Sequence, residues 1–344
     1  SLGNFPIRAV PVIDRQGTAN PVIPDDPLGL LQRGNFIRVP LVIGINRDEG
    51  AFFYPLLKNG YAENSRRNTG YLRDILIPRF LQSTSDLATN SAVVEAIMFA
   101  YFVGVDTANL TEILKPFINM TTDAMYVACH DLTSKTYAQL NIPTYMYVFE
   151  HRGVNSMIDL QLNQQMPKVD AGVSHGDELF YLFDLQVDGI QPLSRLDSLI
   201  STRMVTLWTD FAKYGDAPHF VNYEYPAKWP RLQPDNLTYY RIERDLRISR
   251  DYRQRESDLW LHHLPSLAEI HTLPPTTSPL VEEKVEPVYR TLAWAMVAVA
   301  IALFILVIVL LGFLYNQRKS QSFKASPELG HSRMSGSMSG STLY

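Results

Sequence analysis

Cysteine is almost missing from this chain, which has only Cys129 among 344 residues. No disulfide can therefore close within the chain. We interpret Cys129 as a buried free thiol in a helix, and the alternative is a disulfide to a part of the protein outside this sequence. An excess of positive charge is also missing, since 31 Lys and Arg stand against 35 Asp and Glu, for a net charge of −4. A surface for nucleic acid is thereby excluded.

Metal-ligand patterns are missing as well. His130 stands in Cys129-His130-Asp131, but no second His or Cys follows at the spacing of a metal site. We interpret His130 as a residue on a helix face, and we expect neither a metal ion nor a cofactor. The sequence also shows no internal repeat.

Residues 1–268 carry the signals of one globular α/β domain. Short apolar or aromatic runs at 38–45 and 143–150 predict buried strands, and helical spacing covers 91–103, 121–140 and 194–213. Strands that alternate with helices indicate a mostly parallel sheet flanked by helices.

One apolar segment, residues 292–315, contains no formal charge. As a helix it would be about 36 Å long, enough to cross the apolar part of a bilayer. Lys and Arg exceed acids on its C-terminal side, at Arg318, Lys319, Lys324 and Arg333, so that side should be cytoplasmic. The sequence therefore predicts a single-pass type I protein of the plasma membrane with an extracellular N-terminal domain.

Two segments beside this span read as unstructured. Residues 269–291 form a Pro-, Thr- and acid-rich stalk, and residues 316–344 form a Ser-rich cytoplasmic tail that we expect to be disordered. The last residues could add a strand to a PDZ scaffold, with Thr342 and Tyr344 in the recognised positions, or they could simply be a low-complexity end. Three sequons agree with an extracellular domain, at Asn109, Asn119 and Asn236.

Two glycine-framed polar turns supply an acid and a base. Glu49 follows the first predicted strand, and His175 lies in a Gly- and Ser-flanked loop. Acid before histidine is the end of the Ser, acid, His order of α/β-hydrolases, in which a carboxylate orients the histidine that activates a serine. By pattern alone, both turns could equally be solvated, with Asp48, Asp177 and Glu178 as surface acids and His175 as a surface or capping histidine.

Several ordered blocks favour the catalytic interpretation of those two residues. The sequence from about residue 5 to 268 resembles the C-terminal half of type-B carboxylesterases, the family that includes cholinesterases and their adhesion relatives. The resemblance implies the C-terminal part of an α/β-hydrolase fold, with Glu49 as the triad acid and His175 as the base. It also implies that the nucleophilic serine lies in an N-terminal part absent from this chain, which begins without Met. The matching blocks are Pro21–Pro27, Gly44-x-Asn46-x-Asp48-Glu49-Gly50, Tyr145-x-Tyr147-x-Phe149-x-His151-Arg152, Gly172-x-x-His175-Gly176-x-Glu178-Leu179, Trp208–Lys213 and Trp229-Pro230.

The C-terminal part of the chain indicates which members of the family it resembles most in layout. A type I span after a Pro/Thr stalk is the layout of neuroligin- and gliotactin-like proteins, and Ser257 stands where cholinesterases carry a disulfide cysteine. The tail is shorter than that of typical neuroligins. The resemblance implies a non-catalytic adhesion protein that binds an extracellular protein in trans. The alternative is a membrane-anchored carboxylic-ester hydrolase that uses an upstream serine with Glu49 and His175; this chain alone should be inactive.

The resemblance also implies a homodimer. Helices near 193–213 and 251–264 resemble those that pair into a four-helix bundle in relatives. In the other interpretation, their apolar faces pack on the sheet of the same chain, as Trp208 and Phe211 could do.

Overall fold

The computed structural model describes residues 12–14, 17, 19–58, 61–84, 87, 90–161, 171–217 and 228–270. All of them belong to one compact unit, Ser1–Pro275, and a second unit covers Thr276–Tyr344. The predicted span, the cytoplasmic tail and the stalk from residue 271 onward lie outside the described residues. Within the described part, no helix has the length and apolar character needed to cross a membrane.

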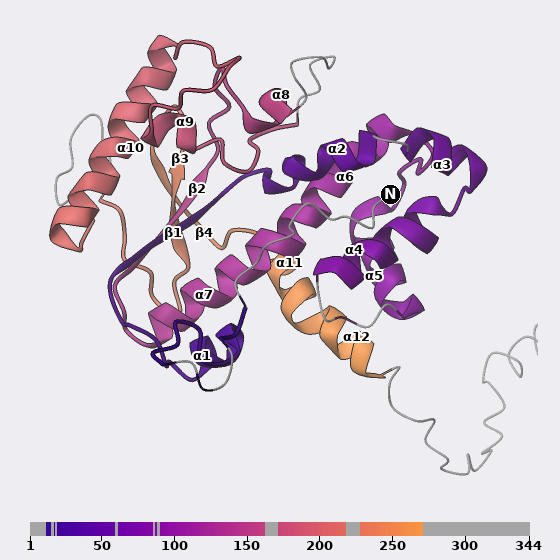
Figure 1. Cartoon of the computed structure of the whole chain (residues 1–344), viewed down its shortest axis with the longest axis horizontal. Helices are drawn as coiled ribbons and strands as arrows, with labels where there is room; N and C mark the ends of the chain where they lie inside the picture. Colours follow the sequence, from indigo (N-terminus) through magenta and orange to yellow (C-terminus); the bar gives the residue numbers. More distant parts are fainter. Residues whose placement is uncertain are drawn as a thin grey trace, which may run out of the picture. The chain divides into compact units, whose positions relative to one another are not determined.

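A four-stranded sheet organises the described part of the chain (Figure 1). Its order follows the sequence, with β1–β2 and β2–β3 parallel and β3–β4 antiparallel. The register of the first pair runs from Leu41 opposite Thr144 to Asn46 opposite Phe149. The mostly parallel sheet flanked by helices is confirmed, and the strands are β1 (Leu41–Asn46), β2 (Thr144–Phe149), β3 (Thr238–Ile242) and β4 (Arg247–Arg250).

Strand β2 lies at the centre of the sheet and is buried along its whole length. Its aromatic residues Tyr145, Tyr147 and Phe149 pack on one face. The cluster there includes side chains of α9 (Leu179–Leu182) and α10 (Arg195–Tyr214). Met146 and Val148 point to the other face, where α7 covers the sheet. The aromatic and β-branched run predicted this strand because a strand buried on both faces needs apolar residues at every position.

A long helical region connects β1 to β2. In it α6, η3 and α7 follow one another without interruption, so the helix predicted at 121–140 begins already at Leu110. Pro116 lies inside α6 and hides the helical pattern, because proline lacks the N–H of an interior turn. The elements of this region are η1 (Glu49–Phe53), α2 (Tyr54–Lys58), α3 (Tyr61–Arg67), η2 (Leu72–Leu76), α4 (Ile77–Thr84), α5 (Ser91–Phe102), α6 (Leu110–Thr122), η3 (Asp123–Val127) and α7 (Ala128–Gln139).

Helix α10 is the longest regular helix outside that region, and its two ends have the residues that begin and end a helix. Ser194 and Asp197 form a capping box at its start, and Gly215 ends it with a positive φ of 66°. Trp208 and Phe211 pack against the sheet cluster, as the second interpretation of this helix expected. The remaining helices are α1 (Pro27–Gln32), α8 (Met157–Gln161), α9 (Leu179–Leu182), α10 (Arg195–Tyr214), α11 (Gln254–Asp258), η4 (Leu259–His263) and α12 (Leu264–Ile270).

Buried polar contacts fix the C-terminal helices. The guanidinium of Arg253 forms an ion pair with the buried Asp123 carboxylate, with Nε 2.7 Å from Oδ1, and its Nη2 donates a hydrogen bond to Oδ2 at 2.7 Å. Ser257 Oγ donates to Asp131 Oδ2 at 2.6 Å. Ser257 thus has a hydrogen-bonding role at the position where the resemblance leads one to expect cysteine in cholinesterases.

Cys129 lies on α7, as expected for a helical thiol, but the prediction that it is buried is wrong, since Cys129 is free and exposed. The buried face of this helix is formed by residues spaced three and four apart, and Cys129 points away from it. Those buried residues are Ala128, His130, Asp131, Ser134 and Ala138.

Candidate functional site

Glu49 is held at the carboxyl end of β1. The strand ends at Asn46, a two-residue turn follows, and Glu49 begins η1 with 4% of its surface exposed. Its Oε1 accepts a hydrogen bond from the Asn46 backbone N–H at 2.7 Å. The solvated-turn interpretation is therefore wrong, because this carboxylate is buried and oriented from its own strand.

His175 completes the predicted pair from the other turn. Its Nδ1 lies 2.7 Å from Glu49 Oε2, although 126 residues separate the two in sequence. An ionised carboxylate at Nδ1 assigns the proton to that nitrogen and leaves Nε2 as the acceptor, as in a catalytic triad. The hydrogen bond to Glu49 raises the pKa of His175, with partial burial opposing it. The imidazole remains half exposed, at 49%.

Aromatic rings flank the imidazole. Phe52 meets it edge-on with ring centroids 5.6 Å apart, and Tyr126 lies tilted at 5.0 Å. Phe52 belongs to η1 and Tyr126 to η3. Glu49 and the flanking ring of Phe52 therefore both come from η1, the segment directly after β1.

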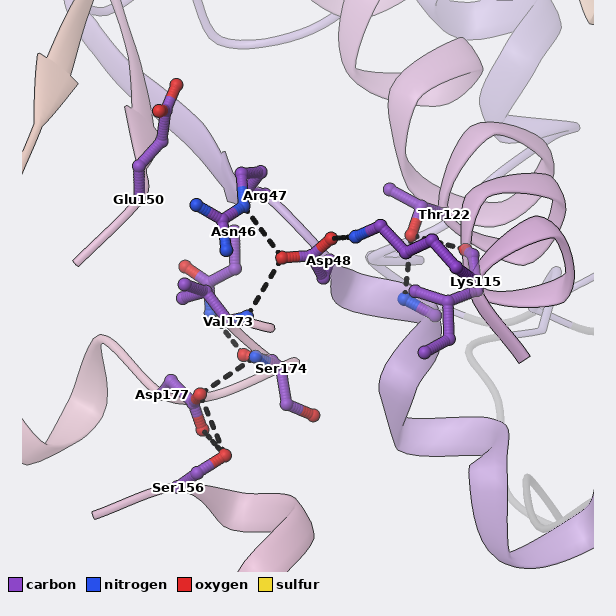
Figure 2. A network of polar contacts seen from close by, with 12 residues as sticks. Asn46, Arg47, Asp48, Lys115, Thr122, Glu150, Ser156, Val173, Ser174 and Asp177 are labelled. Atoms are coloured by element: carbon purple, nitrogen blue, oxygen red, sulfur yellow. Dashed lines mark hydrogen bonds and ion pairs between the residues drawn. The ribbon is translucent and has the colours of Figure 1, made fainter. Parts of the chain in front are cut away.

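Asp48 joins the acid turn to the histidine loop (Figure 2). Its backbone N–H donates to the Val173 carbonyl at 2.9 Å, and its Oδ2 accepts from the Val173 N–H at 3.0 Å. Lys115 and Arg47 pair with the same carboxylate. Burial opposes ionisation, but the hydrogen bonds from Lys115 and Val173 outweigh it and lower the pKa of Asp48. Asp48 is a buried clamp, so its interpretation as a surface acid is wrong.

Asp177 stabilises the other side of the histidine loop. Its carboxylate accepts from Ser156 Oγ at 2.9 Å, the Met157 N–H at 2.7 Å and the Ser174 N–H at 2.8 Å. Burial raises the pKa of Asp177 to about 7, and only 2% of the residue is exposed. It too is no surface acid.

Ser174 fits the Gly-x-Ser-x-Gly pattern of a nucleophile elbow at 172–176, although the nucleophilic serine was expected outside this chain. A working elbow exposes its serine between a strand and a helix. Ser174 is fully buried, and within the described residues its hydroxyl has no hydrogen-bond partner. The geometry therefore does not make Ser174 the nucleophile for His175.

A second histidine–carboxylate pair lies in the same unit and was not predicted. His151 Nε2 is 2.7 Å from Asp197 Oδ1, and the two side chains are 8% and 1% exposed. Tyr181 donates to the same oxygen at 3.2 Å, and Asp197 also belongs to the capping box of α10. His151 appears in a family motif, but nothing in the local pattern points to a partner 46 residues away.

His130 is, with His151, one of two buried histidines among the described residues. It lies on the buried face of α7 next to the backbone of Ile43, and burial lowers its pKa to about 4. No group of three or more His, Cys, Asp or Glu that could hold a metal ion occurs in the part of the chain that the structure describes.

The three sequons differ in their surroundings. Asn109 is exposed and caps α6, with Oδ1 accepting from the Thr111 N–H at 3.0 Å. Asn119 lies inside α6 and is half buried, with Thr121 fully buried. Asn236 is half buried in the turn before β3. The PDZ-type residues Thr342 and Tyr344 lie outside the described residues.

The chain is similar to a protein family and to several known proteins. The model of the carboxylesterase family matches residues 3–260. Neuroligin-2 of Homo sapiens is 28% identical over 279 residues, which cover 76% of this chain and 31% of the relative. Neuroligin-3 of Mus musculus is 26% identical over 280 residues, covering 76% and 32%. Cocaine esterase of Oryctolagus cuniculus is 28% identical over 244 residues, covering 71% and 42%. The chain thus spans about a third of the length of the neuroligins it matches.

Proposed function

This chain belongs to the carboxylesterase family, and from that premise we propose that it is part of a cholinesterase-like cell-surface adhesion protein without catalytic activity. The observation that carries the proposal is the similarity to neuroligins over most of the described unit. We propose further that residues 292–315 span the plasma membrane once and that the described unit is extracellular. The apolar run and the Lys and Arg that follow it support this orientation.

The adhesion proposal is tested with the whole protein on the surface of suspension cells. Its ectodomain should bind an extracellular protein on a second cell population, and His175→Ala should leave that binding unchanged. His262→Ala, at an exposed histidine of η4, is the matched control. Absence of binding by both the unchanged protein and the control, together with ester turnover lost in His175→Ala, would contradict the proposal.

The alternative is a membrane-anchored carboxylic-ester hydrolase, and one observation favours it. The Glu49–His175 pair has the separation that a general base needs, and among the described residues the imidazole bonds a carboxylate through Nδ1 only, which leaves Nε2 to accept a proton. A cocaine esterase is also among the relatives. A serine supplied from outside this sequence would have to approach Nε2. We expect no turnover of a phenyl or naphthyl ester by this chain alone; turnover that His175→Ala abolishes would establish the alternative.

A homodimer remains our proposal for the assembly. Helix α10 exposes Leu199, Val205 and Tyr214, while α12 packs against α5, which exposes Phe99. Single Glu substitutions at Val205 and Phe99 locate the contact by light scattering. Loss of the dimer in either variant supports association through that helix, and a monomeric unsubstituted protein contradicts the proposal.

Glycosylation and scaffold binding are proposed from the sequence pattern. Of the three sequons, Asn109 should carry a glycan most completely, because it is exposed and its Thr111 is exposed too. Mass spectrometry of the secreted domain before and after glycosidase treatment measures occupancy at Asn109, Asn119 and Asn236. Deletion of Tyr344 should abolish binding of the tail to PDZ domains in solution.

A further inference from the structure

Asn46 lies between the two turns that make the histidine–carboxylate pair, and only 1% of it is exposed. Its backbone N–H donates to Glu49 Oε1 at 2.7 Å. Its side-chain Nδ2 donates to the carbonyl oxygen of Ser174 at 2.7 Å and to Glu178 Oε2 at 2.5 Å. One residue therefore contacts the acid, the residue directly before His175, and a second carboxylate.

The orientation of the Asn46 amide is fixed by its neighbours. The Ser174 carbonyl and an ionised Glu178 can only accept hydrogen bonds, so the NH₂ end must face them. The reversed amide would place Oδ1 against two acceptors. Both N–H groups of Nδ2 are used, and a carboxylate at position 46 would repel both partners.

We propose that Asn46 is a positioning residue for the His175–Glu49 pair. Its side-chain amide ties the backbone at Ser174 to the carboxyl end of β1, and this tie brings imidazole Nδ1 to Glu49 Oε2. Its backbone N–H orients the opposite partner from the same point. Asn46 makes no hydrogen bond to the imidazole, so it acts through the loop.

Other groups also hold or surround the pair. Asp48 binds Val173, so the loop has a second tie one residue further from His175. Glu178, Asp177 and Glu49 are the acids whose charge His175 senses. Burial raises the pKa of Glu178, and the hydrogen bond from Asn46 opposes that rise. Removing the amide could thus alter His175 through the charge of Glu178 alone, and the test must separate this route from the loop.

The test measures the pKa of His175 from hydrogen–deuterium exchange at imidazole C2, read residue by residue by mass spectrometry on the full chain. We expect Asn46→Ala to lower the pKa of His175 most of the way to its value in Glu49→Gln, although the backbone bond from residue 46 to Glu49 remains. Glu178→Gln keeps the Ser174 bond but removes the charge. Asn46→Ala should therefore lower the pKa of His175 equally in the Glu178→Gln background.

The matched control is Asn155→Ala. Asn155 is a buried amide that ties another loop, donating to the Gln191 carbonyl and accepting from its N–H, both at 2.8 Å. Its removal should destabilise the fold to a similar extent and leave the pKa of His175 unchanged. If Asn46→Ala does not fold, Asn46→Ser, which can make one of the two bonds, takes its place.

Two results would overturn the proposal. In one, Asn46→Ala leaves the pKa of His175 as it is in the unsubstituted chain. In the other, the effect appears only when Glu178 is ionisable, so that Asn46 acts through charge and not through the loop. The inference rests on the Glu49–His175 pair of the proposed function, but neither cell binding nor ester turnover enters the readout. Its failure is thus distinguishable from failure of the proposed function.

Discussion

Two histidine–carboxylate pairs occur among the described residues, and both have a nitrogen–oxygen distance of 2.7 Å. His175 binds Glu49 through Nδ1 and is half exposed, whereas His151 binds Asp197 through Nε2 and is almost fully buried. The distance alone therefore does not distinguish a structural pair from a functional one. What differs is which ring nitrogen is occupied and whether the other can meet a partner from outside.

The two carboxylates also differ in the number of other groups that they bind. Asp197 serves a helix cap and Tyr181 as well as His151, so its pair connects β2 to α10. Glu49 accepts from the backbone of its own strand and otherwise serves only His175 among the described residues. The His151–Asp197 pair should therefore matter mainly for the stability of the fold. The His175–Glu49 pair should matter mainly for chemistry or recognition at the surface.

The largest effect should come from His151→Ala. It leaves the buried Asp197 carboxylate without its hydrogen bond to His151, and leaving a buried charged acceptor unsatisfied costs more than about 3 kcal/mol. Chemical denaturation of the ectodomain measures the loss, with the exposed His262→Ala as the control. A loss below about 1 kcal/mol would mean that the buried pair is not a structural tie.

A smaller effect should follow from Gly172→Ala, which breaks the exposed pair without changing either member. Gly172 has a φ of 80°, and an added Cβ would meet Asp48 Oδ2 at 2.0 Å. Left-handed backbone and overpacking together should cost about 3 kcal/mol and displace His175 from Glu49.

Gly104→Ala is the matched control for that glycine. Its φ is 76°, but an added Cβ would meet nothing within 4 Å. The left-handed backbone of alanine at this position should then cost about 1 kcal/mol by itself. Equal losses in Gly104→Ala and Gly172→Ala would show that Asp48 does not clamp the histidine loop.

The smallest stability effect should come from His175→Ala, below about 1 kcal/mol, because a half-exposed pair is screened by solvent. Since its pKa is raised in the folded state, His175 stabilises the fold fully below the unfolded value of about 6.5, and this contribution disappears as pH rises through the folded value. Denaturation at pH 5.5 and 8.5 should therefore show a larger loss for His175→Ala at the lower pH. An equal loss at both values would contradict the pairing.

Short motifs in the sequence located the exposed pair, and the ordered family blocks that contain them favoured its catalytic interpretation. Glu49 and His175 stand in short motifs with glycine on both sides, and the strand before Glu49 is a continuous apolar run, so neighbouring residues carry the signal. The buried pair could not be predicted in this way. His151 and Asp197 meet only because α10 packs on β2, and no periodicity encodes that contact.

Polar residues near the site were misread for a related reason. Asp48 and Asp177 stand in glycine-framed turns that resemble solvated loops, yet the two turns face each other and bury both carboxylates. The short strands β3 and β4 were also not predicted. The sequence of β4 shows no alternation of apolar and polar residues that would predict a strand. Its strand structure depends on the antiparallel pairing with β3.

The most direct test of the account is the pKa of His175 in the full chain and in Glu49→Gln, measured by imidazole C2–H exchange with His151 and His262 in the same spectra. The account predicts a pKa above about 6.5 for His175 and a clear decrease when Glu49 loses its charge. A value at or below that figure in the unsubstituted chain, or no change in Glu49→Gln, would contradict the claim that the pair is formed in the folded protein.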